Sequence, residues 1–138
     1  MNANLPRISD VDAVEIARVV RPLTDINERE CVAKLAADVS PGGLIVEIGS
    51  LYGGMTAVLG LARPDAKIIS IDDYSWHPAD DVPTSKELLL ANMKSVGVKN
   101  VTARERFAGD EKYACWDTAL CVWHPYHRGR ALCQPGAA

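Results

Sequence analysis

The sequence predicts an α/β protein built on a doubly wound parallel sheet. Short apolar runs suited to buried strands alternate with helical patterns over residues 44–103. A glycine-bearing turn follows the first of these strands, and the second strand ends in acids. The chain has 138 residues, 48% hydrophobic and 24% charged, which is the composition of one ordinary globular domain.

Residues 1–40 are predicted to form two helices that cover the sheet. Ser9 suits a helix N-cap, and the apolar residues after it recur at helical spacing until Pro22 ends the helix. Thr24 is the expected cap of a second helix, whose apolar stripe reaches Val39 before a Pro-Gly-Gly break.

Residues 44–48 form an almost continuous apolar run, which predicts a strand buried on both faces. The pattern turns helical from Gly53 and is broken at Pro64. Residues 67–71 are the predicted second strand, and a loop rich in Pro and Asp follows over residues 74–83.

A third helix and strand complete the regular part of the chain. Thr84 and Glu87 have the spacing of a capping box, and Gly97 ends the helix that they open. Residues 98–103 are the third predicted strand, and residues 119–122 are a candidate fourth. The pattern indicates a right-handed βαβαβ unit, and thus an incomplete Rossmann-like sheet of about three to four strands with flanking helices.

Charge and hydropathy exclude several partners. The net charge is -3 and the basic residues are scattered among acids, so nucleic acid is not an expected partner. No apolar run approaches the roughly 20 residues that a membrane helix needs, and the first ten residues lack an apolar signal core. The expectations are therefore no membrane association, a cytoplasmic location and reduced cysteines.

The turn after the first strand departs from two phosphate-binding loops. Leu51 stands where the dinucleotide fingerprint has its second glycine. Gly49, Gly54 and Thr56 fit the frame of a P-loop, but Met55 replaces its lysine. Glu47, near the end of the first strand, would also repel a phosphate at the N-terminus of the following helix. S-adenosylmethionine carries an ammonium and a sulfonium and no phosphate, so an acid beside the turn favours this cofactor.

The segments VEIGSLYGGMT and IISIDDYSW resemble motif I and the acidic second-strand motif of class I methyltransferases, most closely the small-molecule O-methyltransferases with an E-I-G-S sequence. The segment LLLANMKSVGVKNVT is similar to the family's third helix and strand, so the resemblance covers residues 41–102.

The resemblance implies a set of cofactor-binding residues. It implies that Glu47, Gly49 and Gly53, with Ser50 of the same motif, surround the methionine part of S-adenosylmethionine. Asp72 would take the two ribose hydroxyls. The residues that follow it would face the adenine: Asp73, Tyr74 and Trp76. The alternative is that Gly49, Gly53 and Gly54 only permit a tight turn and close helix packing. In that case Glu47 and Asp72 would be solvated acids at the ends of the strands.

The resemblance covers only the first half of such a domain. A class I methyltransferase has seven strands, and its fourth ends in an acidic motif, whereas this chain has LCVWHPYH over residues 120–127. Residues 41–123 are therefore expected to be a methyltransferase-like half-domain that is truncated, and residues 124–138 an irregular tail. The tail's Cys and His residues lack metal-ligand spacing, so no metal is expected from Cys115, Cys121, His124, His127 and Cys133.

The expected function is S-adenosylmethionine-dependent methyl transfer to a hydroxyl of a small metabolite, of sugar or polyketide type, impaired if the C-terminal half is lost. The catalytic residue is unknown. His127 alone coincides with a family histidine, and His124 and His77 are unanchored alternatives. The rival interpretation is an inactive fragment that serves as an interaction or oligomerisation module, because an uncovered sheet edge favours homo-oligomers in either case.

One hypothesis for the altered C-terminal part is a change of reading frame after about Arg104, where composition and periodicity change together. It predicts that another frame of the coding DNA encodes an apolar strand followed by acids. Translation of the other two frames checks this, and the hypothesis fails if neither contains such a strand.

Overall fold

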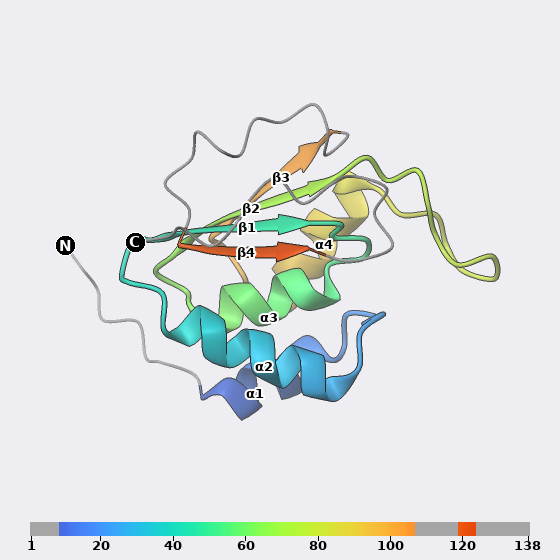
Figure 1. The fold of residues 1–138 in the computed structure, drawn as a ribbon. Helices are drawn as coiled ribbons and strands as arrows, with labels where there is room; N and C mark the ends of the chain where they lie inside the picture. The colour runs from blue at the N-terminus through green and yellow to red at the C-terminus, as the bar shows by residue number, and fades with distance from the viewer. Residues whose placement is uncertain (1–8, 107–118, 124–138) are drawn as a thin grey trace.

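A computed structural model describes residues 9–106 and 119–123, which form an α/β structure with one four-stranded, all-parallel sheet (Figure 1). The strand order is β3-β2-β1-β4. The strands are β1 (Leu44–Ile48), β2 (Lys67–Asp72), β3 (Val101–Glu105) and β4 (Leu120–Trp123). The predicted α/β class and parallel sheet are thereby confirmed, and the candidate fourth strand exists.

Strand β1 lies in the middle of the sheet and sets its register. Its residue Ile45 is opposite Ile68 of β2 on one side and Leu120 of β4 on the other. Because the order reverses next to β1, the carboxyl ends of β1, β2 and β4 meet at a topological switch point. Open α/β sheets bind their ligands at such points.

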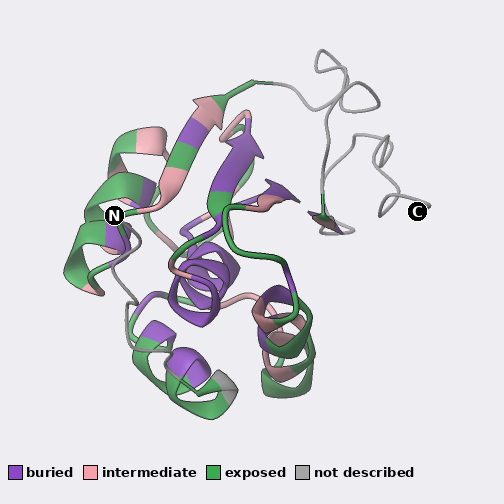
Figure 2. Cartoon of the chain, turned by 90° about the vertical axis from the view of Figure 1, so that its left-hand side faces the viewer, coloured by how far each residue is buried: buried purple, intermediate pink, exposed green. Residues whose placement is uncertain are grey.

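Four helices accompany the sheet, namely α1 (Asp10–Ala17), α2 (Ile26–Ala37), α3 (Gly54–Ala62) and α4 (Lys86–Ser95). Helices α1 and α2 pack against each other and against α3, and α2 also contacts β4. All nine residues of α3 are buried, whereas the other helices are exposed on their outer sides (Figure 2). Helix α3 is therefore the central layer between the sheet and the N-terminal helices (Figure 1).

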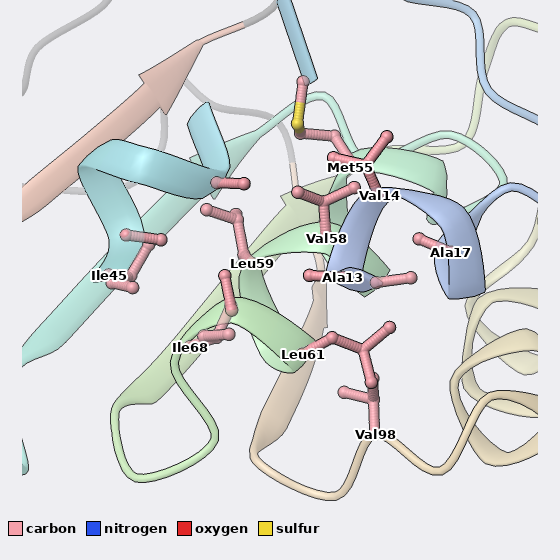
Figure 3. Packing of buried hydrophobic residues seen from close by; sticks show 14 of the residues in the cluster. Ala13, Val14, Ala17, Ile45, Met55, Val58, Leu59, Leu61, Ile68 and Val98 are labelled. Atoms are coloured by element: carbon pink, nitrogen blue, oxygen red, sulfur yellow. The ribbon is translucent and has the colours of Figure 1, made fainter. Parts of the chain in front are cut away.

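The main core lies on the helical face of the sheet. Ile45 and Ile68 project from the strands toward Val58 and Leu59 of α3, and Ala13 of α1 closes the cluster from outside (Figure 3). A second buried cluster contains residues of the strands alone and lies on the opposite face, which follows from the alternation of side chains along a strand. Its buried members are Val46, Ile48, Ile69 and Ile71.

Two helix caps differ from the prediction. Helix α2 is capped by Asp25 rather than Thr24, because the Asp25 carboxylate accepts the Glu28 N–H at 3.0 Å and the Glu28 carboxylate accepts the Asp25 N–H at 3.3 Å. Helix α4 is capped by Ser85, whose hydroxyl accepts the N–H of Leu88. In both places the better-placed acceptor is one residue after the predicted cap.

One strand boundary also differs from the prediction. The third strand is predicted over residues 98–103 but begins at Val101, directly after Asn100. Its amide donates to the carbonyl oxygens of Arg63 and Ala66, at 3.0 and 2.9 Å. Val98 packs into the main core instead, against Gly60 of α3.

No helix in the described part of the chain has the length and apolar character needed to cross a membrane.

Candidate cofactor-binding site

The turn between β1 and α3 is built from left-handed residues. Gly49, Leu51 and Gly53 have φ angles of 88°, 51° and 95°. Glycine adopts this conformation readily, but a leucine there is strained. Such strain persists only where the surrounding structure holds it, and it is concentrated at functional sites.

Two glycines let this turn fit between its neighbours. A Cβ on Gly53 would lie 2.7 Å from the Met93 side chain and 2.9 Å from that of Leu89, both on α4. A Cβ on Gly54 would lie 2.9 Å from the Arg21 carbonyl oxygen, in the connection between α1 and α2. The glycines therefore serve close packing on both sides of the turn, as the alternative interpretation of the sequence held.

The Asp72 carboxylate ties the turn to the end of β2. Its Oδ2 accepts the backbone N–H of Leu51 at 2.8 Å, and its Oδ1 accepts the N–H of Tyr74 at 2.8 Å. Tyr74 is itself left-handed, with φ of 53°. Asp72, which is 3% exposed, thus holds the two non-glycine residues that are left-handed in the described part of the chain. We call this arrangement the Asp72 clamp.

Two buried hydroxyls at the clamp have no hydrogen-bond partner. They belong to Ser50 and Tyr74. The two side chains are close enough to interact, but no hydrogen bond of acceptable geometry joins them. Burial raises the pKa of Tyr74 well above its ordinary value, and the nearby Ser50 hydroxyl opposes that rise. Buried polar groups are normally paired, so unpaired hydroxyls point to a group that binds there.

Glu47 is fully buried beneath α3, with an exposed fraction of 0%. Its Oε2 accepts hydrogen bonds from the hydroxyls of Thr56 in α3, at 2.5 Å, and Ser70 in β2, at 2.9 Å. The idea that Glu47 is a solvated strand-end acid is therefore wrong, because its partners are buried with it. The carboxylate joins β1, β2 and α3, and its predicted contact with a cofactor stays a prediction.

The predicted residues gather at one edge of the sheet. Gly49, Ser50 and Gly53 lie in the turn, and Asp72 is bonded to it. Asp73 follows, half-buried, and its carboxylate accepts the Ser75 N–H and hydroxyl at 3.1 and 2.7 Å. Of the six residues, Glu47 is set apart because it lies underneath the turn.

A cavity of about 340 Å³ adjoins this edge. Its walls come from the connection between α1 and α2, from α2, from the turn and the start of α3, and from Val122 of β4. Among the lining residues, Gly49 and Ser50 belong to the predicted site, and Thr24, like Ser50, has a buried hydroxyl without a partner. The cavity therefore lies at the carboxyl ends of β1 and β4, next to the turn.

Arg21 and Tyr52 shape this cavity, although nothing in the sequence marked them. Arg21 forms an ion pair with Asp81 of the loop after β2, and its guanidinium lies 5.9 Å from the centre of the Tyr52 ring. The Tyr52 hydroxyl donates to the Val82 carbonyl oxygen at 2.5 Å. These partners are remote along the chain, so only the position of Tyr52 inside the glycine turn could have signalled a role.

Other candidates from the sequence lie outside the described residues or make contacts within the loop after β2. In the parts of the chain that the structure describes, no three His, Cys, Asp or Glu side chains are grouped to hold a metal ion. Cys115, His124, His127 and Cys133 lie outside those parts. His77 lies in the loop after β2, where its Nδ1 is 2.9 Å from the Pro78 carbonyl oxygen.

No protein-family model matches the sequence, and no curated protein matches it. Solved structures do match. Precorrin-6y C5,15-methyltransferase from Geobacter metallireducens aligns with a TM-score of 0.52 and 17% identity, over 75% of this chain and 50% of that one. The SAH-bound methyltransferase PaMTH1 from Podospora anserina aligns with a TM-score of 0.51 and 21% identity, over 78% of this chain and 46% of that one.

A third match is a cyclopropane-fatty-acyl-phospholipid synthase-like protein from Lactobacillus casei, with a TM-score of 0.50 and 18% identity, over 83% of this chain and 46% of that one. At these identities the comparison establishes the fold, which is the Rossmann-like fold of class I methyltransferases. The chain spans about half the length of each of these structures.

The Asp72 clamp predicts unequal effects of two neighbouring substitutions. Asp72→Asn presents an amide NH₂ to one of the two backbone N–H donors, so we expect a loss of about 1–3 kcal/mol of unfolding free energy. Asp73→Asn alters an exposed local turn and should cost less than about 1 kcal/mol. Urea unfolding of both variants measures the difference, and equal losses would contradict the clamp.

The buried Tyr74 phenol predicts a pH dependence. Its pKa is raised above the ordinary 10.0, so the folded protein holds this proton more tightly than the unfolded chain does. The resulting stability is complete below about pH 10 and is lost as the pH rises toward the folded-state pKa. Tyr74→Phe has no such proton, so its unfolding free energy should decline less steeply above about pH 10. Urea unfolding at a series of alkaline pH values checks this, and parallel declines would exclude Tyr74 as the cause.

Proposed function

We propose that the chain binds S-adenosylmethionine at the carboxyl edge of its sheet and contributes to methyl transfer onto a hydroxyl of a small molecule. The observation that carries the proposal is the clamped, glycine-bearing turn beside a cavity, on a fold shared with methyltransferases. Methyl transfer is also the activity named for two of the matching structures.

The residues at the turn fit this cofactor in two respects. The unpaired hydroxyls of Ser50 and Tyr74 leave hydrogen-bonding capacity where a polar ligand would lie. Gly49 and Gly53 bring the backbone close to that place without a side chain. The turn lacks the lysine that a triphosphate needs, so it suits a ligand without phosphate better than a nucleotide.

Each predicted residue receives a role. Gly49, Ser50 and Gly53 would hold the methionine part, Asp72 would hold the two ribose hydroxyls, and Asp73 would lie on the adenine side. Asp72 also accepts the backbone N–H groups of Leu51 and Tyr74, so it would join the cofactor's ribose to the turn and to the β2 loop. Glu47 would keep α3 in place on the sheet, through Thr56 and Ser70.

The chain's contribution to the reaction is placement. When bound, S-adenosylmethionine supplies an electrophilic methyl group for in-line displacement. Such a reaction depends on holding acceptor and methyl group at near-attack distance, so a rigid edge is what the protein must provide. The Asp72 clamp fixes the turn from one side, and the contact of Gly53 with α4 fixes it from the other.

A second candidate function is an interaction module without catalysis. Strands β3 and β4 are the outer strands of the described sheet, and an outer strand offers backbone groups that can pair with another chain. In this case the sheet would serve assembly, including self-association, and the edge would bind no cofactor.

Calorimetry with S-adenosylhomocysteine separates the two functions. We expect saturable binding by the wild type. The affinity of Asp73→Asn should be lower by a factor of about ten or more, because the variant loses a charged hydrogen-bond acceptor. Asp38→Asn is the matched control, because Asp38 is an exposed acid at the C-terminal end of α2. Absence of binding at millimolar ligand, or equal affinities for all three proteins, would favour the interaction module.

A further inference from the structure

The cavity beside the turn has mainly apolar walls. Val32 of α2, Met55 of α3 and Val122 of β4 face it, together with Leu23 and Leu51. A ligand covered by these side chains is stabilised in proportion to the apolar surface that it buries. A molecule with an apolar body is therefore favoured over one that is polar on every side.

Two hydroxyls interrupt this apolar lining. Ser50 is 4% exposed and Thr24 carries a buried Oγ1, and neither hydroxyl has a hydrogen-bond partner. Ser50 is also proposed to contact the cofactor, and because a hydroxyl can donate one hydrogen bond and accept two, it can contact both ligands where they meet. A buried polar group without a partner destabilises the protein, and a ligand that bonds to it removes that cost. The two belong to different segments, Thr24 before α2 and Ser50 after β1, so the cavity has polar points on both walls.

The charged groups at the cavity disfavour an anion. Arg21 is the only cationic side chain in the described lining, and it is engaged by Asp81 and by the Tyr52 ring. Glu28, on α2, adds a carboxylate that would repel an anionic ligand. A sugar is disfavoured for another reason, because a ring with a hydroxyl on most carbons needs more partners than two hydroxyls provide.

We infer that this cavity binds the methyl acceptor, and that the acceptor is an uncharged, mainly apolar alcohol or phenol rather than a sugar or a phosphorylated compound. The inference rests on the proposed function for the transfer itself. The acceptor oxygen bonds to the methyl carbon of S-adenosylmethionine as the carbon–sulfur bond breaks. The electron pair stays on sulfur, S-adenosylhomocysteine leaves, and the hydroxyl proton passes to solvent.

Cys31 provides a direct probe of occupancy, because it lines the cavity and is exposed. The experiment measures its alkylation by iodoacetamide in the full chain, with peptide mass spectrometry to distinguish it from the other cysteines. The probes are 2-naphthol, which is uncharged at neutral pH, 2-naphthoate, which has the same ring system and a negative charge, and glucose. We expect 2-naphthol to slow the alkylation of Cys31 at least threefold, and the other two to leave it unchanged.

Variants connect the protection to the cavity walls. Val32→Asp places a charge on the apolar wall and should abolish protection by 2-naphthol, whereas Thr24→Val should weaken it about fivefold through loss of one hydroxyl partner. Leu90→Ala is the control, since Leu90 is an exposed apolar residue on α4 and is not part of this lining. If Val32→Asp or Thr24→Val fails to fold, the other variant still tests whether protection depends on the cavity walls.

The outcomes separate this inference from the proposed function. Equal protection by 2-naphthoate, stronger protection by glucose, or no protection by 2-naphthol overturns the inferred acceptor class. If S-adenosylhomocysteine alone protects Cys31, the cavity belongs to the cofactor and the inference fails, while the proposed function stands. If 2-naphthol protects Cys31 but calorimetry shows no binding of S-adenosylhomocysteine, the cavity stands and the proposed function fails.

Discussion

The arrangement of the carboxyl edge of the sheet depends on the hydrogen bonds that the Asp72 carboxylate accepts. It holds two strained residues, Leu51 after β1 and Tyr74 after β2, by their backbone N–H groups. Without an acceptor at this place, two buried donors would be unpaired and two left-handed residues would lose their restraint. The clamp therefore joins the turn and the β2 loop into one unit, which places Ser50 against Tyr74 and at the cavity wall.

A second carboxylate, that of Glu47, also joins elements at this edge of the sheet. Glu47 links β1, β2 and α3 through buried hydroxyls, and α3 in turn carries the N-terminal helices that form the far wall of the cavity. Methyl transfer needs accurate placement more than acid–base chemistry. A turn held from below by Glu47 and from the side by Asp72 would suit the proposed reaction, since both carboxylates make hydrogen bonds to other elements.

The sequence predicted the order and type of the elements, because buried strands and amphipathic helices have distinct periods. It missed caps by one residue where two acceptors are adjacent, as at Thr24 and Asp25. The sequence also indicated the polar residues at the carboxyl edge, but not the residues to which they form hydrogen bonds. Glu47 bonds to residues 9 and 23 positions away, and such pairings depend on packing rather than on local pattern. The cavity was beyond prediction for the same reason, since its walls come from remote segments.

We propose that the clamped carboxyl edge binds a sulfonium cofactor. A titration of ¹⁵N-labelled protein with S-adenosylhomocysteine, followed by NMR, tests this proposal. We expect saturable shifts of the amide signals of Gly49, Ser50, Gly53 and Asp73, with no change at Gly43 and Asn100 near the amino ends of the strands. Shifts confined to the amino ends, or none at saturating ligand, would contradict it.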